Sequence, residues 1–225
     1  MASSEGFVST TEAARTLGVT VQHVRRLADS GELTRVARGL INRDSLERYL
    51  LERQGGRTRV WAEHTAWGAI AILSGMHPDW LGPSQTSRVR ASLREITDPA
   101  ALVAQTRDRA SVHVYQAHPS ALQRLLDDLV TTDATRLGLV GTQPDHVDGY
   151  LSADRLDSTV GFFGLREEPT GDVTIRATHF DTNAVRAITM HGDVLAALDA
   201  ATSRDPRERG VGERALAEAL AQFRR

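Results

Sequence analysis

Residues 8–49 read VSTTEAARTLGVTVQHVRRLADSGELTRVARGLINRDSLERY, and this stretch decides the fold of the N-terminal part of the chain. Its first half predicts two short helices, at 11–17 and 20–29, because small and aliphatic residues recur there at helical spacing. Gly18 between them has the conformational freedom that a sharp turn needs. The candidate N-terminal caps are Thr10 and Thr11 for the first helix and Thr20 for the second. The pattern indicates a helix-turn-helix.

The second predicted helix has a polar face that suits DNA. Its apolar residues, at positions 21, 24, 27 and 28, share one side, whereas Gln22, His23, Arg25 and Arg26 point away from that side. Glutamine can bind adenine through two hydrogen bonds, and arginine can bind guanine in the same way or bind a phosphate. A helix also fits the major groove. We therefore expect double-stranded DNA as a partner.

A β-hairpin, or wing, is predicted after the second helix. Two short extended runs, 32–36 and 40–43, flank the glycine-bearing turn Ala37-Arg38-Gly39. Arginine side chains near the tip of such a hairpin could reach the DNA backbone. Asp44 can then cap a third helix at 44–53.

The order of these elements resembles the excisionase-type branch of the MerR-like winged helix family. The resemblance rests on TTEAARTLGVT, VRRL, GEL and INRDSLERY, which occur in the family's order. In that family the second helix and the wing bind DNA, so the resemblance implies candidate contacts by position. These are Thr20, Gln22, His23, Arg25, Arg26, Arg35, Arg38 and Arg43. The wing departs from the family, which often has consecutive basic residues where this chain has Leu40-Ile41-Asn42.

Charge is unevenly distributed along the chain. Residues 1–60 hold ten arginines against seven acidic residues, a net charge of +3, and the remainder holds seventeen against twenty-two, a net charge of −5. A basic N-terminal part on an acidic body suits a DNA reader that is joined to a part which does not coat nucleic acid. The alternative is that these arginines are the solvated face of a small protein-interaction domain.

The composition is that of a globular protein. Of the 225 residues, 40% are apolar and 25% are charged, and there is no cysteine and no lysine. The lack of cysteine excludes disulfides, thiolate zinc sites and cysteine nucleophiles, and it fits a reducing compartment. No apolar run approaches the length of a membrane span, and the first residues lack the features of a signal peptide. We therefore expect a cytoplasmic protein with no membrane partner.

The whole chain is predicted to be α+β, with an N-terminal winged helix-turn-helix followed by a mixed helix-and-sheet C-terminal domain. We expect a DNA-binding domain at 1–55, a helical segment at 56–110, and an α+β domain at 111–225 that binds a partner or dimerises. The paired glycines in 54–60 suggest a hinge. Beyond the hinge, the expected helices are 61–74, 84–96 with a Ser84 cap, 98–109, one capped near Ser120, 152–165, 184–201 and 211–224; the expected strands are 112–115, 137–140, 147–151 and 172–180.

The C-terminal half is similar to that of AbiEi-type antitoxin regulators. The similarity rests on AHPSALQRLL at 117–126, VDGYLSADRL at 147–156, EEPTGDVTIRAT at 167–178, and on DVLAALDA and SRDPRERG between 193 and 210. Such regulators are encoded beside nucleotidyltransferase-like toxins in bacteria. The resemblance implies a head that binds the promoter of its own operon and a body needed for antitoxin action, and it transfers no toxin-contacting residue.

Catalytic and metal sites have little support in the sequence. The closest histidine–aspartate groups lie at 77–79, 145–148, 179–181 and 191–193, and a metal site would require two of them to converge. There is no phosphate-binding loop, because that motif needs a lysine, and no Gly-x-Ser-x-Gly elbow. We expect no catalytic residues, no metal and no cofactor, and hence a protein that is not an enzyme.

The sequence thus predicts a DNA-binding transcriptional regulator, a repressor that could also be the autoregulating antitoxin of a toxin–antitoxin pair. A homodimer is expected because a single small head should bind DNA weakly. Two alternatives stay open. One is an architectural recombination factor of the excisionase type, and the other is an enzyme whose active site lies in the C-terminal domain.

Overall fold

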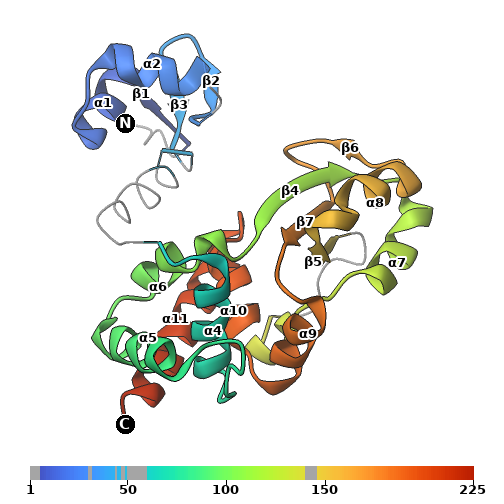
Figure 1. Ribbon diagram of the computed structural model, residues 1–225. Helices are drawn as coiled ribbons and strands as arrows, with labels where there is room; N and C mark the ends of the chain where they lie inside the picture. Colours follow the sequence, from blue (N-terminus) through green and yellow to red (C-terminus); the bar gives the residue numbers. More distant parts are fainter. Residues whose placement is uncertain (1–5, 30–31, 44, 47–48, 50–59, 140–145) are drawn as a thin grey trace. The chain divides into compact units, whose positions relative to one another are not determined.

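A computed structural model describes residues 6–29, 32–43, 45–46, 49, 60–139 and 146–225 (Figure 1). Its contacts divide the chain into two units, Met1–Thr58 and Arg59–Arg225. Each unit has its own hydrophobic core. The expected three-part division of the chain stays a prediction.

The first unit contains a helix-turn-helix. The helices are α1 (Thr10–Leu17) and α2 (Val21–Asp29), and they pack around the buried side chains of Ala13, Leu17, Val24 and Leu27. The turn between them is left-handed at Gly18, where φ is +63°, and the Val19 amide donates to the Ala14 carbonyl over 3.0 Å. A residue with a Cβ adopts this conformation only at a cost, which explains the glycine.

The N-terminal cap of α1 differs from the sequence prediction. Ser9, rather than Thr10 or Thr11, accepts a hydrogen bond from the Glu12 amide over 3.1 Å, and the helix begins one residue earlier than predicted. Ser9 is also the last residue of a strand, β1 (Phe7–Ser9), which was not predicted. A three-residue strand leaves too little alternation in the sequence to be recognised.

The wing is confirmed as a hairpin of β2 (Arg35–Ala37) and β3 (Leu40–Asn42), and β1 joins it to give a sheet in the order β1-β3-β2. Both pairings are antiparallel, and Val8 lies opposite Ile41 where the sheet contacts the core. Of the predicted third helix at 44–53, Ser45, Leu46 and Tyr49 are described and are helical. Its other positions, and 54–59 of the predicted hinge, lie outside the described residues.

The second unit combines a helical cluster with a four-stranded sheet (Figure 1). Its helices are α4 (Glu63–Leu73), α5 (Pro83–Glu95), α6 (Pro99–Gln105), α7 (Pro119–Asp128), α8 (Leu156–Phe163), α9 (Thr182–His191), α10 (Val194–Ala201) and α11 (Pro206–Phe223). Short 3-10 turns are η2 (Arg107–Arg109), η3 (Ala134–Leu137) and η4 (Ala153–Arg155). The strands are β4 (Ser111–Gln116), β5 (Val147–Ser152), β6 (Arg166–Glu167) and β7 (Val173–Thr178).

The sheet has the order β5-β7-β4-β6 and is covered on both faces. β7 runs parallel to β5 and antiparallel to β4. The face that carries Val173 and Ile175 packs on α7 and α8, whereas Tyr150 on the other face belongs to the core of the helical cluster. The sheet is backed by helices as predicted, and three of its strands, β4, β5 and β7, were predicted; its fourth strand, β6, was not. The polar side of β7 is therefore buried, and Arg176 on it is 5% exposed.

Several element predictions need correction. The predicted strand at 137–140 is wrong over 137–139, because Asp133 caps the 3-10 turn η3 there and Gly138 ends it with φ +74°; position 140 lies outside the described residues. The predicted helix at 98–109 ends at Gln105 and is followed by η2. The predicted helix at 184–201 is two helices, α9 and α10, since the backbone is extended at Gly192. The last helix begins at Pro206, five residues earlier than predicted, with Asp205 as its cap. α5 begins after Gly82 instead of a Ser84 cap.

Within the described residues, no helix is both long enough and apolar enough to cross a membrane.

Two glycines of α11 have opposite surroundings, and this difference can be tested by substitution. A Cβ at Gly212 would lie 2.6 Å from the Ala197 carbonyl oxygen, whereas at Gly210 the nearest atom would be Nη1 of Arg214, at 3.5 Å. Gly212→Ala should therefore destabilise the second unit by about 1–3 kcal/mol, because α10 and α11 must move apart. Gly210→Ala should stabilise it by up to about 1 kcal/mol through helix propensity.

Urea unfolding followed by tryptophan fluorescence would measure both effects, since all three tryptophans lie between residues 61 and 80. A stabilising Gly212→Ala substitution would contradict the close packing of these two helices.

Candidate nucleic-acid interface

The helix α2 is amphipathic, as the sequence predicts, with one apolar face and one polar face. Val24 and Leu27 are buried in the core of the first unit. Gln22, Arg25 and Arg26 are exposed. The exposed residues lie at helical spacing on the side of α2 that faces away from the core, so their side chains are available to a groove of DNA.

Two hydrogen bonds organise the first turns of α2. Thr20 caps the helix, because its hydroxyl oxygen accepts from the His23 amide over 3.2 Å. This confirms the predicted cap, and the hydroxyl hydrogen is left free to donate to another acceptor. His23 is half-buried, and its Nδ1 lies 2.7 Å from Nη2 of Arg26. The pair at i and i+3 holds the Arg26 guanidinium beside the imidazole.

The tip of the wing carries an exposed arginine. Arg38 precedes Gly39, whose φ of +83° makes the turn possible, and the Thr10 amide donates to the Gly39 carbonyl over 2.9 Å. This bond joins the turn of the wing to the start of α1. Arg43, the residue after β3, is half-buried, and its amide donates to the Gly6 carbonyl over 3.1 Å.

Arg35, at the base of the wing, has protein partners. Its Nη2 lies 2.7 Å from a carboxylate oxygen of Asp29 and donates to the Arg25 carbonyl over 3.4 Å. The two side chains are 43% and 65% exposed, so this is a surface ion pair. Arg35 thus bridges β2 and the C-terminal end of α2.

Ser45 also fixes the base of the wing. Its hydroxyl accepts from the Thr34 amide over 3.0 Å and donates to the Asn42 carbonyl over 2.8 Å. The Asn42 side chain accepts in turn from the Ser45 amide over 2.8 Å. Ser45 is buried, and the sequence analysis did not single it out. A serine just after a predicted strand is a weak signal, because its partners become evident only when the hairpin is formed.

The structure brings the predicted DNA contacts onto two neighbouring elements of one unit. Thr20, Gln22, His23, Arg25 and Arg26 lie at or on α2, and Arg35, Arg38 and Arg43 lie on or next to the wing. Whether each of these residues contacts DNA stays a prediction.

The histidine–aspartate groups do not converge in the described part of the chain. No group of three or more histidine and acidic residues with metal-binding geometry occurs among the residues described. In the 77–79 group, His77 Nε2 lies 3.9 Å from a carboxylate oxygen of Asp79, and both side chains are mostly exposed. Asp145, in another of these groups, lies outside the described residues.

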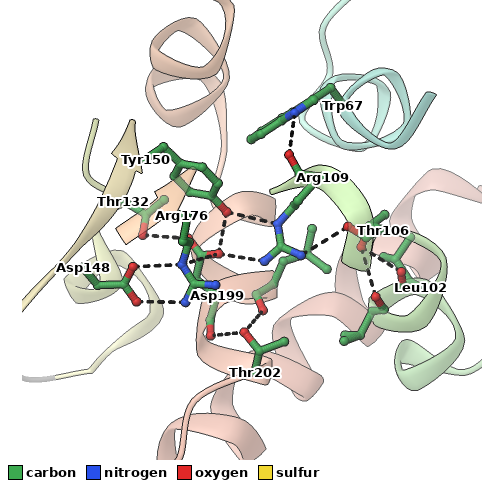
Figure 2. Close-up of polar contacts among 12 residues, drawn as sticks. Trp67, Leu102, Thr106, Arg109, Thr132, Asp148, Tyr150, Arg176, Asp199 and Thr202 are labelled. Atoms are coloured by element: carbon green, nitrogen blue, oxygen red, sulfur yellow. Dashed lines mark hydrogen bonds and ion pairs between the residues drawn. The ribbon is translucent and has the colours of Figure 1, made fainter. Parts of the chain in front are cut away.

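A buried cluster of charged residues lies in the second unit (Figure 2). Asp199 of α10 accepts from Nη2 of Arg109 over 2.9 Å and from the Tyr150 hydroxyl over 2.6 Å. Nε of Arg176 lies 3.4 Å from the same carboxylate and also binds Asp148, which accepts two hydrogen bonds of 2.8 Å from that guanidinium. The two arginines and two aspartates balance in charge.

The cluster holds its arginines in the charged state. Burial opposes the charge of Arg109, but Tyr150 and Asp199 outweigh it, so the pKa of the guanidinium is raised. Burial likewise opposes the charge of Arg176, yet Asp199 and Asp148 raise its pKa well above the ordinary value. Burial raises the pKa of the Tyr150 phenol, which remains a hydrogen-bond donor. These groups bind one another in the protein interior, an arrangement suited to fixing α10 against the sheet.

Comparison with known protein families gives a match at the N-terminal end of the chain. A family model described as "Transcriptional regulator, AbiEi antitoxin" matches residues 2–40, which is 39 of the 225 residues. No curated protein matches the chain, and no solved structure does. The match supports a DNA-binding regulator. It lies in the N-terminal unit, whereas the AbiEi resemblance was seen in the C-terminal half, and the excisionase-type resemblance of the N-terminal part is not confirmed.

The charge balance of the Asp199 cluster predicts a large effect of a single substitution. Asp199→Ala should destabilise the second unit by about 3–5 kcal/mol, because it leaves the buried Arg109 without its carboxylate partner. Asp199→Asn should also be strongly destabilising, since an amide supplies no charge. Asp79→Ala, which removes an exposed carboxylate, should change the stability by no more than about 0.5 kcal/mol.

Urea unfolding reports all three values through Trp67, which packs edge-on against Tyr150 with ring centroids 5.4 Å apart. An Asn variant as stable as the unmodified protein would show that the charge of Asp199 is not needed.

Proposed function

We propose that this chain is a DNA-binding transcriptional repressor that inserts α2 into the major groove. The observation that carries the proposal is the exposed row formed by Gln22, Arg25 and Arg26, on a helix whose opposite side is buried. The family match over residues 2–40, which ends at the first residue of β3, supports the same role.

The proposed contacts follow from side-chain chemistry. Gln22 is suited to adenine, whose N6 and N7 match the donor and acceptor of an amide. Arg25 and Arg26 are suited to guanine or to phosphate. Arg38 at the tip of the wing would contact the backbone beside the same groove. In this scheme the cations set the affinity, while Gln22 and one arginine distinguish sequences.

We further propose that the chain acts as a homodimer. Residues 1–60 have a net charge of only +3, and the charge-dependent part of DNA affinity grows with the number of phosphates neutralised. Two heads on one site would double that number. A dimer would read two half-sites about one helical turn apart, or a multiple of it.

The finer proposal is that the repressor is the antitoxin of a toxin–antitoxin pair and controls its own operon. Its N-terminal unit would bind the promoter, and its second unit would bind a nucleotidyltransferase-like toxin encoded by a neighbouring gene. The description of the matched family, which names an AbiEi antitoxin, supports this role. The proposed role requires no catalytic step.

DNA binding can be tested by recovering the genomic fragments that the purified full-length protein retains. Arg25→Ala/Arg26→Ala should lose specific retention, because it removes two cations from the exposed face of α2. The matched control is Arg186→Ala/Arg207→Ala, which removes the same charge from exposed positions of α9 and α11. Equal retention by both double variants would contradict the proposed interface, as would no retention by the unmodified protein.

The antitoxin role predicts a stable complex with the product of an adjacent gene. Coexpression of the two proteins should give copurification, and growth inhibition by the neighbouring protein expressed without this chain should be relieved by the chain. Arg25→Ala/Arg26→Ala should still relieve it, because the substituted residues lie in the other unit. If no adjacent gene product copurifies, the protein is a repressor without an antitoxin role.

A further inference from the structure

The resemblance to the excisionase-type family implies that Arg35 contacts DNA, but the surroundings of its side chain indicate a different role. The guanidinium lies at the C-terminal end of α2, where Asp29 is the last helical residue. Helix carbonyls at this end lack helical partners and carry partial negative charge. A cation is favourable there, and Arg35 supplies one from the first residue of β2.

The backbone just before Arg35 is tied to α2 and to β3. Leu33 is buried, and its amide donates to the Leu27 carbonyl over 3.1 Å. The next residue, Thr34, accepts at its carbonyl from the Asn42 amide over 2.9 Å. The side chain of Arg35, with its contacts to Asp29 and to the Arg25 carbonyl, adds a further link between the hairpin and α2.

The pairing also determines which cations remain for DNA. Asp29 balances Arg35, so the pair brings no net charge to a polyanion. Within the described residues, the exposed side chains of Arg25 and Arg38 form no ion pair. Among the candidate contacts, Arg25 on α2 and Arg38 at the tip of the wing therefore keep their charge for phosphate.

We propose that Arg35 is a positioning residue that sets the angle between α2 and the wing through Asp29 and the Arg25 carbonyl, and does not bind phosphate. The inference rests on the proposed function, because the angle matters only when helix and wing bind one duplex together. Asp29 thereby has a role in DNA binding, although the negative charge of its carboxylate repels DNA.

Substitution of Asp29 distinguishes this role from simple electrostatics. Asp29→Ala removes a negative charge from beside the DNA-binding face and from the negative end of a helix dipole. Electrostatics therefore predicts tighter binding, whereas the positioning role predicts weaker binding. An exposed ion pair has a modest energy, so we expect Asp29→Ala and Arg35→Ala each to weaken binding by about two- to fivefold. The double variant should bind no more weakly than either single one.

The binding measurements use the full chain and a labelled duplex taken from the fragment that the unmodified protein retains most. Each titration is repeated over a range of salt concentrations. Arg38→Ala is the control for a phosphate contact and should reduce the salt dependence by about one counterion. Arg35→Ala should leave it unchanged. Tighter binding by Asp29→Ala, together with a reduced salt dependence for Arg35→Ala, would overturn the proposal.

Hydrogen–deuterium exchange of the same proteins without DNA separates this inference from the proposed function. Asp29→Ala and Arg35→Ala should both speed the exchange of amides in 32–42, and Arg38→Ala should not. If the unmodified protein binds no specific DNA, the proposed function fails, and faster exchange in both variants still shows that the pair fixes the wing. Unchanged exchange in both variants refutes the positioning role itself.

Discussion

The Asp199 carboxylate lies between two buried guanidinium groups, and the second unit depends on it. Arg109 lies in η2, just after α6, Arg176 lies on β7, and Asp199 lies on α10. A buried charge is tolerated only when it is paired, so none of these three elements can shift without exposing or isolating a charge. The Tyr150 hydroxyl on β5 binds both Arg109 and Asp199 and brings a second strand into the arrangement. The helical cluster and the sheet are thereby joined by polar contacts as well as by apolar packing, which favours one arrangement over others of similar compactness.

The pairing of charges in this cluster could not be predicted from the sequence. Periodicity depends on neighbours in the chain, and it was sufficient for α1, α2, the hairpin and the strands β4, β5 and β7. On β7, Arg176 lies on the opposite face from Val173 and Ile175, and no pattern in the sequence shows that helices cover that face. Arg109 and Asp199 are 90 residues apart in the chain, and no local pattern indicates that they pair. The wrong prediction of a strand at 137–140 has a local cause instead. The Asp133 cap and the left-handed Gly138 favour a tight turn, although the apolar residues there suggested a strand.

The candidate DNA interface could likewise be predicted only in part from the sequence. The exposed face of α2 could be predicted because an amphipathic helix presents its polar residues whatever it packs against. The role of an individual arginine could not be predicted, since it depends on whether a carboxylate lies close enough to form an ion pair with it. Asp29 and Arg35 stand at the two ends of the connection between α2 and the wing, and their opposite charges were a signal in the sequence. That signal is weak without the hairpin that brings the two groups to 2.7 Å.

The pairing of charges inside the first unit bears on how such a small head could bind DNA. Every arginine that is neutralised by a carboxylate of its own unit is lost to the phosphates, so the net charge of residues 1–60, +3, measures attraction better than the ten arginines do. A head with few available cations depends more on shape, that is, on helix and wing meeting one duplex at a fixed angle. An intramolecular ion pair that lowers the attraction while fixing this angle can therefore increase specificity, because non-specific binding depends on charge and specific binding also depends on fit. The same reasoning favours two heads over one, since a second head adds contacts without raising the charge of either.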